Sequence, residues 1–470
     1  MAIGSVPSSP PTVTFWGAAQ TVTGSMHLVE FGKQKVLLDC GLYRGTRGEA
    51  RLRNSRFPFH PHSIDAVVLS HAHVDHCGNL ANLVRQGFTG PIYCTSATYA
   101  LLEIILPDSA RIQEEEAHHA RVLAPRGELP HAYATFRYDA LQTLRQCVAV
   151  PYEKTVAVTP GVKLQFYDAG HILGSAMAHL TVTHAGRDHS LTFTGDLGRR
   201  GLPFLRAPAP IPPADLLVCE STYGGRSHQT LGDLAAALQR IVYETVARGG
   251  KVLIPAFSLG RTQVVVHFLQ QWIGRGLVPA VPVYVDSPLA DDIAQVYRAY
   301  PDLLDQIALA DGDPDFLDNA RVHFLRTIEQ SQKQSMATEQ CIIVASGGMC
   351  EGGRIVRHLK RHLDDPRCTI VLVSYQAPQT LGRQLLELRP SVRFHGRSWN
   401  KWADVVELNG FSGHADQADF LALLGPMGSQ FGKVRLVHGE LAAGEALAAG
   451  LRAAGYKDVS VPLPGEKVEF

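Results

Sequence analysis

The chain has 470 residues, which at roughly 100 to 200 residues per domain indicates two to four domains with a large buried core. Hydrophobic residues make up 45% of the chain and charged residues 19%, so a largely disordered protein is excluded. Basic and acidic residues both number 44, so the net charge is zero and any nucleic-acid site must be a local groove.

Short strands separated by turns are expected in the first part of the chain. Three of them, between Thr12 and Cys40, predict an antiparallel start to a sheet. The apolar run from Asp65 to His71 is long enough for one buried strand, and a helix is predicted from His76 to Gln86. Residues 96 to 148 are predicted to be mainly helical. Three more strands with glycine-containing turns are expected at 162–170, 177–186 and 189–198.

From Asp215 onward the pattern changes to strands that alternate with helices. Such alternation predicts a mostly parallel sheet with helices on both faces. After about Gly410 a helix near Asp416 to Leu424, one more strand and a helix near Leu441 to Ala454 are expected. The sequence therefore predicts one domain that is interrupted by another.

The strongest chemical signal is the run SHAHVDH at residues 70–76, where the apolar strand ends. His71 and His73 are two residues apart, so on an extended backbone they share one face, while Asp75 and His76 fall where the chain turns into a helix. Neutral imidazoles and a carboxylate are the ligands that zinc, or less often manganese or iron, requires. The alternative, four ordinary surface residues, leaves this crowding at a buried strand end unexplained.

This H-x-H-x-D-H spacing resembles the signature of the metallo-β-lactamase superfamily. Each of four more residues follows an apolar strand, in that family's order. A single such residue would more often belong to an ordinary turn, whereas four in the family's order favour the resemblance. The four residues are Asp39, His171, Asp196 and His438.

The resemblance implies a pair of divalent metal ions, zinc in the first place with manganese as the alternative. It implies one ion bound by His71, His73 and His171 and a second bound by Asp75, His76 and His438, with Asp196 bridging them. Asp39 would orient the ligands through hydrogen bonds, and Asp75 counts among the catalytic residues as well. Two such ions roughly 3.5 to 4 Å apart can activate water and neutralise charge on a phosphoryl oxygen.

Further motifs resemble the β-CASP nucleases, a family within that superfamily. Glu220 in CESTYGG, His414 in FSGHAD and His438 in LVHGE match its motifs A, B and C. The resemblance covers essentially the whole chain after residue 12 and is closest to bacterial RNA-degrading exonucleases, relatives of the endonuclease subunit of the eukaryotic pre-mRNA 3′-end cleavage complex. It implies an α/β protein, with an αββα metallo-β-lactamase sandwich (1–216 and 411–470) and an inserted α/β β-CASP domain (217–410).

His414 and Glu220 suggest the proton donor of the reaction. A departing ribose oxygen needs a proton, and a histidine whose cationic form is favoured by a nearby carboxylate can supply it near neutral pH. His414 is therefore assigned as general acid and Glu220 as its orienting partner. The structural alternative is that His414 only caps the helix that begins near Asp416.

Contacts to the substrate are expected in the inserted domain. Glycine-rich turns before helices expose backbone N–H groups suited to phosphate oxygens, and arginines just after parallel strands lie where open α/β sheets bind ligands. Solvated helix faces and simple connecting turns are the alternatives. The candidates are Arg261, Ser346, Gly347, Gly348, Arg354 and Arg383.

Together these motifs and the resemblance imply a metal-dependent ribonuclease that cleaves single-stranded RNA. The resemblance implies an exonuclease that leaves 5′-phosphate and 3′-hydroxyl ends. A DNA-directed β-CASP nuclease and a small-molecule hydrolase of the lactamase kind are the alternatives. A non-catalytic binding subunit is a weaker one, because this chain keeps all the ligands. The balance of exonuclease and endonuclease action and the oligomeric state, a homodimer included, stay open.

Targeting signals and cysteine usage favour a cytoplasmic protein. Residues 1–11 are expected to be disordered and lack the apolar core of a signal peptide. No stretch approaches the roughly 20 apolar residues that span a bilayer, so no membrane association is expected. The eight cysteines are scattered without a Cys-x-x-Cys pair, which fits a reducing compartment.

Overall fold

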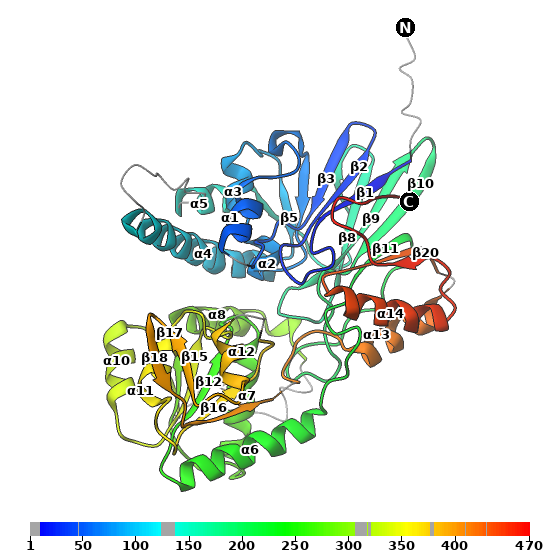
Figure 1. Ribbon diagram of the computed structural model, residues 1–470. Coiled ribbons are helices and arrows are strands. Elements are labelled where there is room, and N and C mark those ends of the chain that lie inside the picture. The colour runs from blue at the N-terminus through cyan, green and yellow to red at the C-terminus, as the bar shows by residue number, and fades with distance from the viewer. Residues whose placement is uncertain are drawn as a thin grey trace. The chain divides into compact units, whose positions relative to one another are not determined.

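The computed structural model describes residues 10–45, 47–123, 137–305, 317, 321–376, 380–408, 410–428 and 430–470. The chain forms two compact units (Figure 1). The first comprises Met1–Arg200, Ala207–Ser227 and His414–Phe470, and the second comprises Gly201–Arg206 and His228–Gly413. Residues 1–9 of the segment expected to be disordered lie outside the described residues, whereas the carbonyl of Pro11 accepts a hydrogen bond from the amide of Phe470.

The first unit contains fourteen of the strands in the described residues. They are β1 (Thr12–Gly17), β2 (Met26–Phe31), β3 (Gln34–Leu38), β4 (Ala66–Val68), β5 (Ile92–Cys94), β6 (Cys147–Ala149), β7 (Val156–Thr159), β8 (Val162–Asp168), β9 (Ala176–His184), β10 (Arg187–Phe193), β11 (Ala214–Glu220), β20 (Phe431–Val437), β21 (Val459–Ser460) and β22 (Lys467–Glu469). Its helices are α1 (Arg47–Ser55), α2 (Val74–Cys77), α3 (Leu80–Arg85), α4 (Ser96–Leu123), α5 (Arg137–Gln146), α13 (Gln417–Leu424) and α14 (Leu441–Ala453), with short 3-10 turns at Pro61–Ser63 and Gly425–Met427.

These strands form two seven-stranded sheets that pack against each other. Their orders are β22-β1-β2-β3-β4-β5-β6 and β21-β20-β11-β10-β9-β8-β7. One core cluster takes Phe15 from the first sheet and Phe166 from the second, and another joins Leu217 of β11 to Phe420 of α13 and Leu447 of α14. Helices flank both sheets (Figure 1), so the expected αββα sandwich is confirmed.

Strand pairing explains where the first unit ends. The expected boundary after residue 216 falls inside β11, which pairs in parallel with β20 from Ala214 to Glu220 and with β10. A strand in the middle of a sheet cannot be divided between two domains without losing its hydrogen bonds. The first unit therefore extends through Ser227, and it resumes at His414 rather than at residue 411.

The helix predicted from His76 to Gln86 is two helices in the structure. α2 ends at Cys77 and α3 begins at Leu80, because Gly78 and Asn79 redirect the chain between them. The amide of Asn79 donates to the carbonyl of Cys40, 2.9 Å away, instead of continuing the first helix. The chain predicted as helical from 96 to 148 contains α4, α5 and the short strand β6, and residues 124–136 lie outside the described part.

The second unit contains a parallel sheet and a hairpin. Its strands are β12 (Val252–Ala256), β13 (Val283–Asp286), β14 (Val322–Phe324), β15 (Ile342–Ser346), β16 (Thr369–Leu372), β17 (Ser391–Phe394), β18 (Arg397–Asn400) and β19 (Asp404–Glu407). Its helices are α6 (Leu231–Ala247), α7 (Arg261–Gly274), α8 (Pro288–Ala299), α10 (Ile328–Met336), α11 (Ile355–His362) and α12 (Leu381–Leu386), with a 3-10 turn at Pro301–Leu303.

Six of these strands form one sheet in the order β14-β13-β15-β12-β16-β19, and each of its strand pairs is parallel. This confirms the parallel sheet predicted from the alternation of strands and helices. The remaining two, β17 and β18, form an antiparallel hairpin that the sequence reading did not anticipate. Within the described residues, no helix is long and apolar enough to cross a membrane.

A close backbone contact in the first unit requires glycine at position 41. The amides of Cys40 and Leu42 donate to the carbonyls of His76 and Val74, at 2.8 and 3.0 Å. Between them, a Cβ atom on Gly41 would lie 1.6 Å from the carbonyl oxygen of Asp75. The loop after β3 can therefore lie against α2 only without a side chain at this position.

We predict that Gly41→Ala lowers the free energy of unfolding by about 2 kcal/mol or more, because the added methyl group forces two backbone segments apart. Chemical denaturation measures this change. Gly48→Ala is the control, since nothing lies within 4 Å of a Cβ atom at that position in α1. Equal stability of both variants would contradict the prediction.

Candidate metal centre

The seven predicted metal ligands gather just beyond the ends of strands in the first unit. Two four-residue groups and one three-residue group of the described side chains have donor atoms within 4.8 Å of one another. Together these groups contain every predicted ligand, and also Glu220 and His414. The ligands occupy these places: His71 and His73 follow β4, Asp75 and His76 lie in α2, His171 follows β8, Asp196 follows β10 and His438 follows β20.

Three imidazoles and one carboxylate oxygen form the first set of donors. Nε2 of His71 lies 3.0 Å from Nδ1 of His73, which lies 3.3 Å from Nε2 of His171. Oδ2 of Asp196 lies 3.4 Å from the Nε2 atoms of His71 and His171. These four atoms therefore lie close enough together to bind one cation.

The second set lies on the other side of Asp196. Nε2 of His76 is 3.1 Å from Nε2 of His438, which is 3.5 Å from Oδ2 of Asp75. Oδ1 of Asp196 is 3.2 Å from Nε2 of His76. Asp196 therefore directs a different oxygen toward each set, which is the arrangement that a bridging carboxylate needs.

The spacing of these donors fits divalent cations. Tetrahedral zinc with bonds of about 2.0 to 2.1 Å separates its ligand atoms by about 3.3 Å, and the distances within both sets lie close to that value. In addition, Oδ1 of Asp196 is buried and accepts no hydrogen bond from the described residues. A buried carboxylate oxygen without a partner costs free energy, which a bound cation would offset.

Asp39 orients two of the imidazoles, one directly and one through Ser70. Its Oδ1 accepts the backbone N–H of Ser70 at 2.8 Å, and its Oδ2 accepts the Ser70 hydroxyl at 2.9 Å and Nδ1–H of His76 at 2.7 Å. Because the Ser70 hydroxyl donates its one proton to Asp39, its oxygen accepts from Nδ1–H of His71, 3.0 Å away. In the neutral form of each ring, both histidines therefore present the lone pair of Nε2 toward the centre.

Thr222 orients the ring of His438 through a hydrogen bond in the same way. Its hydroxyl donates to the His438 carbonyl at 2.8 Å, so its oxygen accepts from Nδ1–H of the same residue at 3.0 Å. Nε2 of His438 is then left with a lone pair that faces Nε2 of His76. Two lone pairs at this distance repel each other unless a cation or a proton lies between them.

The backbone at two of these positions is unusual. Asp39 has φ 57° and His438 has φ 48°, both in the left-handed region that residues other than glycine seldom adopt. The amide of Asp39 donates to Val68 and that of His438 to Ala18, at 3.0 and 2.7 Å. Such conformations cost about 1 kcal/mol or more each, and they occur where the fold must direct a side chain into a site.

Burial keeps most of the imidazoles neutral, and the neighbouring histidines keep the carboxylates ionised. Burial, helped by the neighbouring His76, lowers the pKa of His71 to about 3, and burial lowers the pKa of His73 to about 4. Burial also opposes the charge of Asp75, but its hydrogen bond to His438 and the nearby imidazoles hold its pKa below the usual value. Neutral imidazole and ionised carboxylate are the forms that bind metal.

His76 is the exception. Burial acts to lower its pKa, but the carboxylates of Asp196 and Asp39 outweigh burial and hold the pKa well above its ordinary value. Without a metal, a proton on Nε2 of His76 separates the opposed nitrogens. A cation bound there would displace that proton, so metal uptake is coupled to proton release.

Glu220 and His414 lie beside the two donor sets. Nδ1 of His414 is 3.0 and 3.2 Å from the two carboxylate oxygens of Glu220, which also accept the amides of Leu197 and Thr222. Burial acts to lower the pKa of His414, but Glu220 and then Asp196 raise it to about 9. Its Nε2 faces Oδ2 of Asp196 at 3.9 Å. The helix that follows is capped by Asp416 and not by His414.

The predicted substrate contacts all lie in the second unit, where β12, β15 and β16 end. Arg261 donates to the carbonyl of Val373 at 3.0 Å, and Arg383 donates twice to the carbonyl of Gln376. Arg354 forms more contacts than the other two arginines. Its guanidinium donates to Oδ1 of Asp286 at 2.6 Å and to two backbone carbonyls. These arginines therefore hold loops together, whatever else they contact.

The predicted glycine-rich turn follows β15. The hydroxyl of Ser346 accepts the amide of Arg354 at 3.3 Å. A Cβ atom on Gly347 would lie 2.1 Å from the carbonyl oxygen of Gly352, and one on Gly348 would touch the ring of Phe257 at 3.0 Å. Close packing thus disfavours a side chain at both positions, whether or not they contact a ligand.

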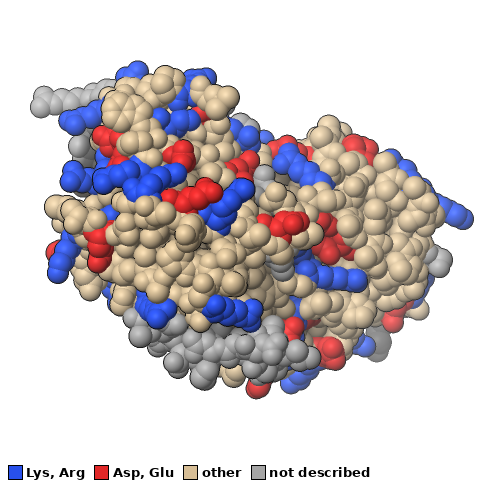
Figure 2. Space-filling model, turned by 90° about the horizontal axis from the view of Figure 1, so that it is seen from below, with Lys and Arg blue, Asp and Glu red and all other residues tan. Residues whose placement is uncertain are grey.

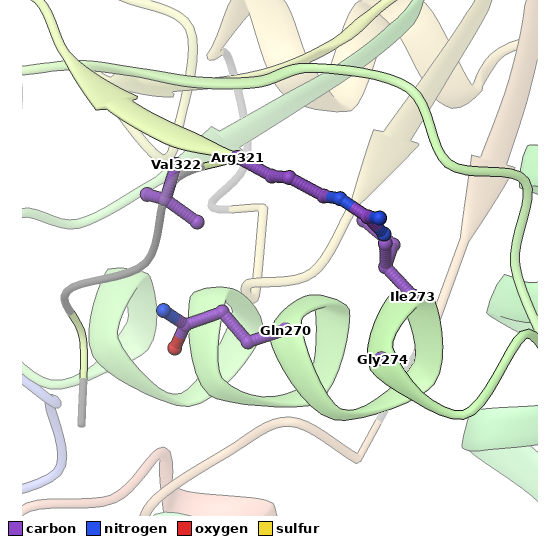
Figure 3. A pocket seen from close by; sticks show the side chains of 5 residues that line it. All are labelled: Gln270, Ile273, Gly274, Arg321 and Val322. Carbon is purple, nitrogen blue, oxygen red and sulfur yellow. The ribbon is translucent and has the colours of Figure 1, made fainter. Parts of the chain in front are cut away.

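A small pocket in the second unit is separate from these residues. It lies between α7 and the start of β14, where the side chain of Gln270 points toward Val322 and Arg321 extends over Ile273 (Figure 3). Nε2 of Gln270 is buried without a hydrogen-bond partner in the described part of the chain. No histidine, cysteine or carboxylate lines this pocket, so it is no rival metal site.

Models of three protein families match the chain. The metallo-β-lactamase superfamily matches residues 20–240, the β-CASP domain matches 262–385, and the Zn-dependent metallo-hydrolase RNA specificity domain matches 402–462. All seven predicted ligands and Glu220 lie in the first or the last of these stretches, as does His414.

Curated relatives extend over nearly the whole chain. Ribonuclease TTHA0252 of Thermus thermophilus is 36% identical over 441 residues, which cover 92% of this chain and 95% of that protein. The transcription termination factor FttA of Methanocaldococcus jannaschii is 32% identical over 444 residues, which cover 91% of this chain and 67% of that protein. A crystal structure of a protein of unknown function from Enterococcus faecalis V583 shares the fold, with a TM-score of 0.54 and 14% identity over 98% of this chain and 100% of that one.

The chain therefore belongs to the metallo-β-lactamase superfamily of metal-dependent hydrolases. Within that superfamily it is a member of the β-CASP family, as the motifs around Glu220, His414 and His438 implied.

Sequence reasoning missed three residues that support the centre: Ser25, Ser70 and Thr222. Ser25 donates to Oδ2 of Asp39 at 3.1 Å, in addition to the bonds described above for Ser70 and Thr222. Ser70 stands directly before His71 in SHAH, and Thr222 stands two residues after Glu220 in CEST, so both could have been found from the sequence. Ser25 lies 14 residues before Asp39, and nothing in the sequence links the two.

We predict that Thr222→Val weakens zinc binding by about 10- to 100-fold, because Nδ1 of His438 loses the acceptor that holds its tautomer and ring orientation. A competition titration against a zinc chelator measures the affinity. Thr183→Val is the matched control, since this exposed threonine bonds Asp188 away from the centre. Unchanged zinc affinity in Thr222→Val would show that the hydroxyl does not support the ligand.

Proposed function

We propose that this protein is a dinuclear metal-dependent ribonuclease that hydrolyses phosphodiester bonds of single-stranded RNA in RNA processing or degradation. The observation that carries the proposal is the buried Glu220–His414 pair beside two sets of metal donors. It is supported by the 36% identity to a ribonuclease over 95% of that protein's length and by the match to an RNA specificity domain. We further propose that the enzyme is cytoplasmic and that it degrades RNA from an end. We also propose a homodimer, and sedimentation measures the oligomeric state.

We propose zinc as the resident metal, with manganese as the alternative. Nitrogen-rich donor sets spaced for tetrahedral geometry favour zinc over cations that prefer oxygen ligands. When bound, the two cations would lower the pKa of a water molecule and neutralise charge on a phosphoryl oxygen. In this proposal the first ion is bound by His71, His73 and His171, the second by Asp75, His76 and His438, and both by Asp196, with Asp39 orienting His76.

The chain itself supplies the proton for the leaving group. Glu220 accepts Nδ1–H of His414, which leaves the proton on Nε2 for transfer and keeps the imidazolium form available near neutral pH. As the oxygen of a water molecule bonds to phosphorus and the bond from phosphorus to the 3′-oxygen breaks, transfer of that proton to the 3′-oxygen yields a 3′-hydroxyl on one fragment and a 5′-phosphate on the other. In the second unit, Arg261, Arg354, Arg383 and the turn from Ser346 to Gly348 are proposed to contact the RNA.

Two alternative functions share the metal centre. A small-molecule hydrolase would use the same donors but would give no role to the Glu220–His414 pair. A DNA-directed nuclease would use the whole centre and would differ in its indifference to the ribose 2′-hydroxyl.

The test is a time course of cleavage of RNA labelled at either end, with DNA of the same sequence beside it, by zinc-replete protein. We expect cleavage of RNA well above that of DNA, with mononucleotides from the outset. Internal fragments would replace the exonuclease part of the proposal by endonuclease action. His76→Ala should lose bound zinc, as measured by elemental analysis, and should also lose cleavage.

Other outcomes overturn the proposal. Equal cleavage of DNA would favour the DNA-directed nuclease, and failure of the metal-replete protein to cleave either polymer would favour a small-molecule substrate. Undiminished cleavage by His76→Ala would refute its assigned role.

We predict that His414→Ala lowers kcat for RNA about 10²- to 10⁴-fold while bound zinc is retained, because a proton donor and not a ligand is removed. Loss of zinc would instead make His414 a ligand. Glu220→Gln should move the alkaline limb of the pH profile to lower pH, since the carboxylate raises the pKa of His414 and the protonated form is the active one. His60→Ala, an exposed histidine, is the control.

A further inference from the structure

The stretch from Leu388 to Trp402 concentrates positive charge in a chain whose net charge is zero. It contains four basic residues, Arg389, Arg393, Arg397 and Lys401, and no acidic residue. On the face shown in Figure 2, by comparison, basic and acidic side chains are interspersed. Most of this stretch lies between the matched family regions, which end at residue 385 and resume at residue 402.

The stretch folds as the β17–β18 hairpin (Figure 1). His395 and Gly396 form its two-residue turn, with φ of 49° and 75°, as the type I′ turns of tight hairpins require. Val392 pairs with Trp399 and Phe394 with Arg397, so these side chains share one face of the ribbon.

That inner face anchors the hairpin to the second unit. Val392 is buried in a core cluster, and Phe394 and Trp399 pack against the same cluster. The rings of Phe394 and Trp399 are stacked, with centroids 5.3 Å apart. The hairpin is therefore held in place by apolar contacts on one side only.

The opposite face is polar. Ser391 pairs with Asn400 and Arg393 with Ser398, so the alternation of side chains directs these four away from the core cluster. Arg393, Ser398 and Asn400 are exposed, and so is Arg397 beside the turn. Where the hairpin joins the rest of the unit, the side chain of Trp402 is 59% exposed.

The charges of the outer face and of the turn end are not compensated. Within the described residues, neither Arg393 nor Arg397 forms an ion pair, whereas Arg389 pairs with Glu387 at 2.6 Å. Other arginines of the unit are also paired: Arg248 with Asp404, Arg326 with Asp291 and Asp292, Arg354 with Asp286, and Arg367 with Asp365. Two unpaired guanidinium groups on a rigid ribbon, with hydroxyl and amide groups beside them, match a chain of phosphates.

We propose that the outer face of the β17–β18 hairpin and its turn end form an accessory surface for single-stranded RNA, with Arg393 of the outer face and Arg397 beside the turn on phosphates and a base stacked on Trp402. The inference rests on the proposed ribonuclease function and adds a site that is separate from the metal centre and from the predicted contacts at the sheet edge. RNA is favoured over a protein partner because the side chains of the outer face are cationic or hydrogen-bonding and the exposed ring of Trp402 beside the hairpin offers a surface for base stacking.

The test measures binding of a fluorescent oligouridylate of about 30 nucleotides by anisotropy, with zinc-loaded protein that carries His414→Ala to suppress cleavage. In this background, Arg393→Gln/Arg397→Gln should weaken binding about tenfold at low salt. It should also reduce the slope of log affinity against log salt by about 1.4, since each phosphate contact to a single strand contributes about 0.7. Trp402→Ala should weaken binding with little change of this slope.

Arg187→Gln/Arg240→Gln is the matched control, because it removes the same charge from side chains that are 73% and 72% exposed elsewhere. Arg393→Lys/Arg397→Lys should keep most of the affinity, and thermal unfolding verifies that each variant is folded.

Equal losses of RNA affinity in both glutamine pairs, or no loss in the hairpin pair, would overturn the accessory surface while wild-type RNA cleavage still supported the proposed function. A changed oligomeric state with unchanged RNA affinity would also overturn it and would identify a second copy of the chain as the occupant. Absence of RNA binding and cleavage by the wild type would overturn both proposals.

Discussion

Buried carboxylates that face buried imidazoles are the constraint on which this structure depends. Asp196 is held ionised away from bulk water and Asp75 is held ionised where it is partly buried, and a buried charge that lacks a partner costs several kcal/mol. Hydrogen bonds from Asp39 and Thr222 orient the imidazoles so that their lone pairs face these carboxylates. A cation is the partner that satisfies both the carboxylates and the lone pairs, so the demand for metal is a consequence of how the first unit folds.

The apolar core between the two sheets supplies the stability that offsets the cost of burying these polar groups. Strands from distant parts of the sequence end together, and the apolar cluster between the sheets keeps those ends in register. The unusual backbone at Asp39 and His438 and the contact at Gly41 are tolerated because the surrounding strands determine them. The chemistry thus lies at the edge of the sandwich, and the stability comes from its interior.

The second unit uses its arginines in a different way. Arg354 is joined to Asp286, which also accepts from His358 at 2.7 Å, so this predicted RNA contact is part of a buried network. Arg393 and Arg397 extend from a hairpin whose inner face is apolar and whose outer face is polar. Which arginines stabilise the fold and which are available to a ligand therefore follows from packing and not from charge.

The sequence by itself predicted the parallel sheet from the alternation of strands and helices, and the family and its sandwich from the resemblance of its motifs. It also predicted which histidines and aspartates gather at the candidate metal centre, because they stand just after apolar strands. Only the tertiary structure decided that Ser25 reaches Asp39, that β11 belongs wholly to the first unit and that the helix after His73 breaks at Gly78. It also decided that two hairpin arginines form no ion pair with any residue that the structure describes. These depend on contacts between residues far apart in the chain, and the free energy of such contacts has no counterpart in the local order of residues.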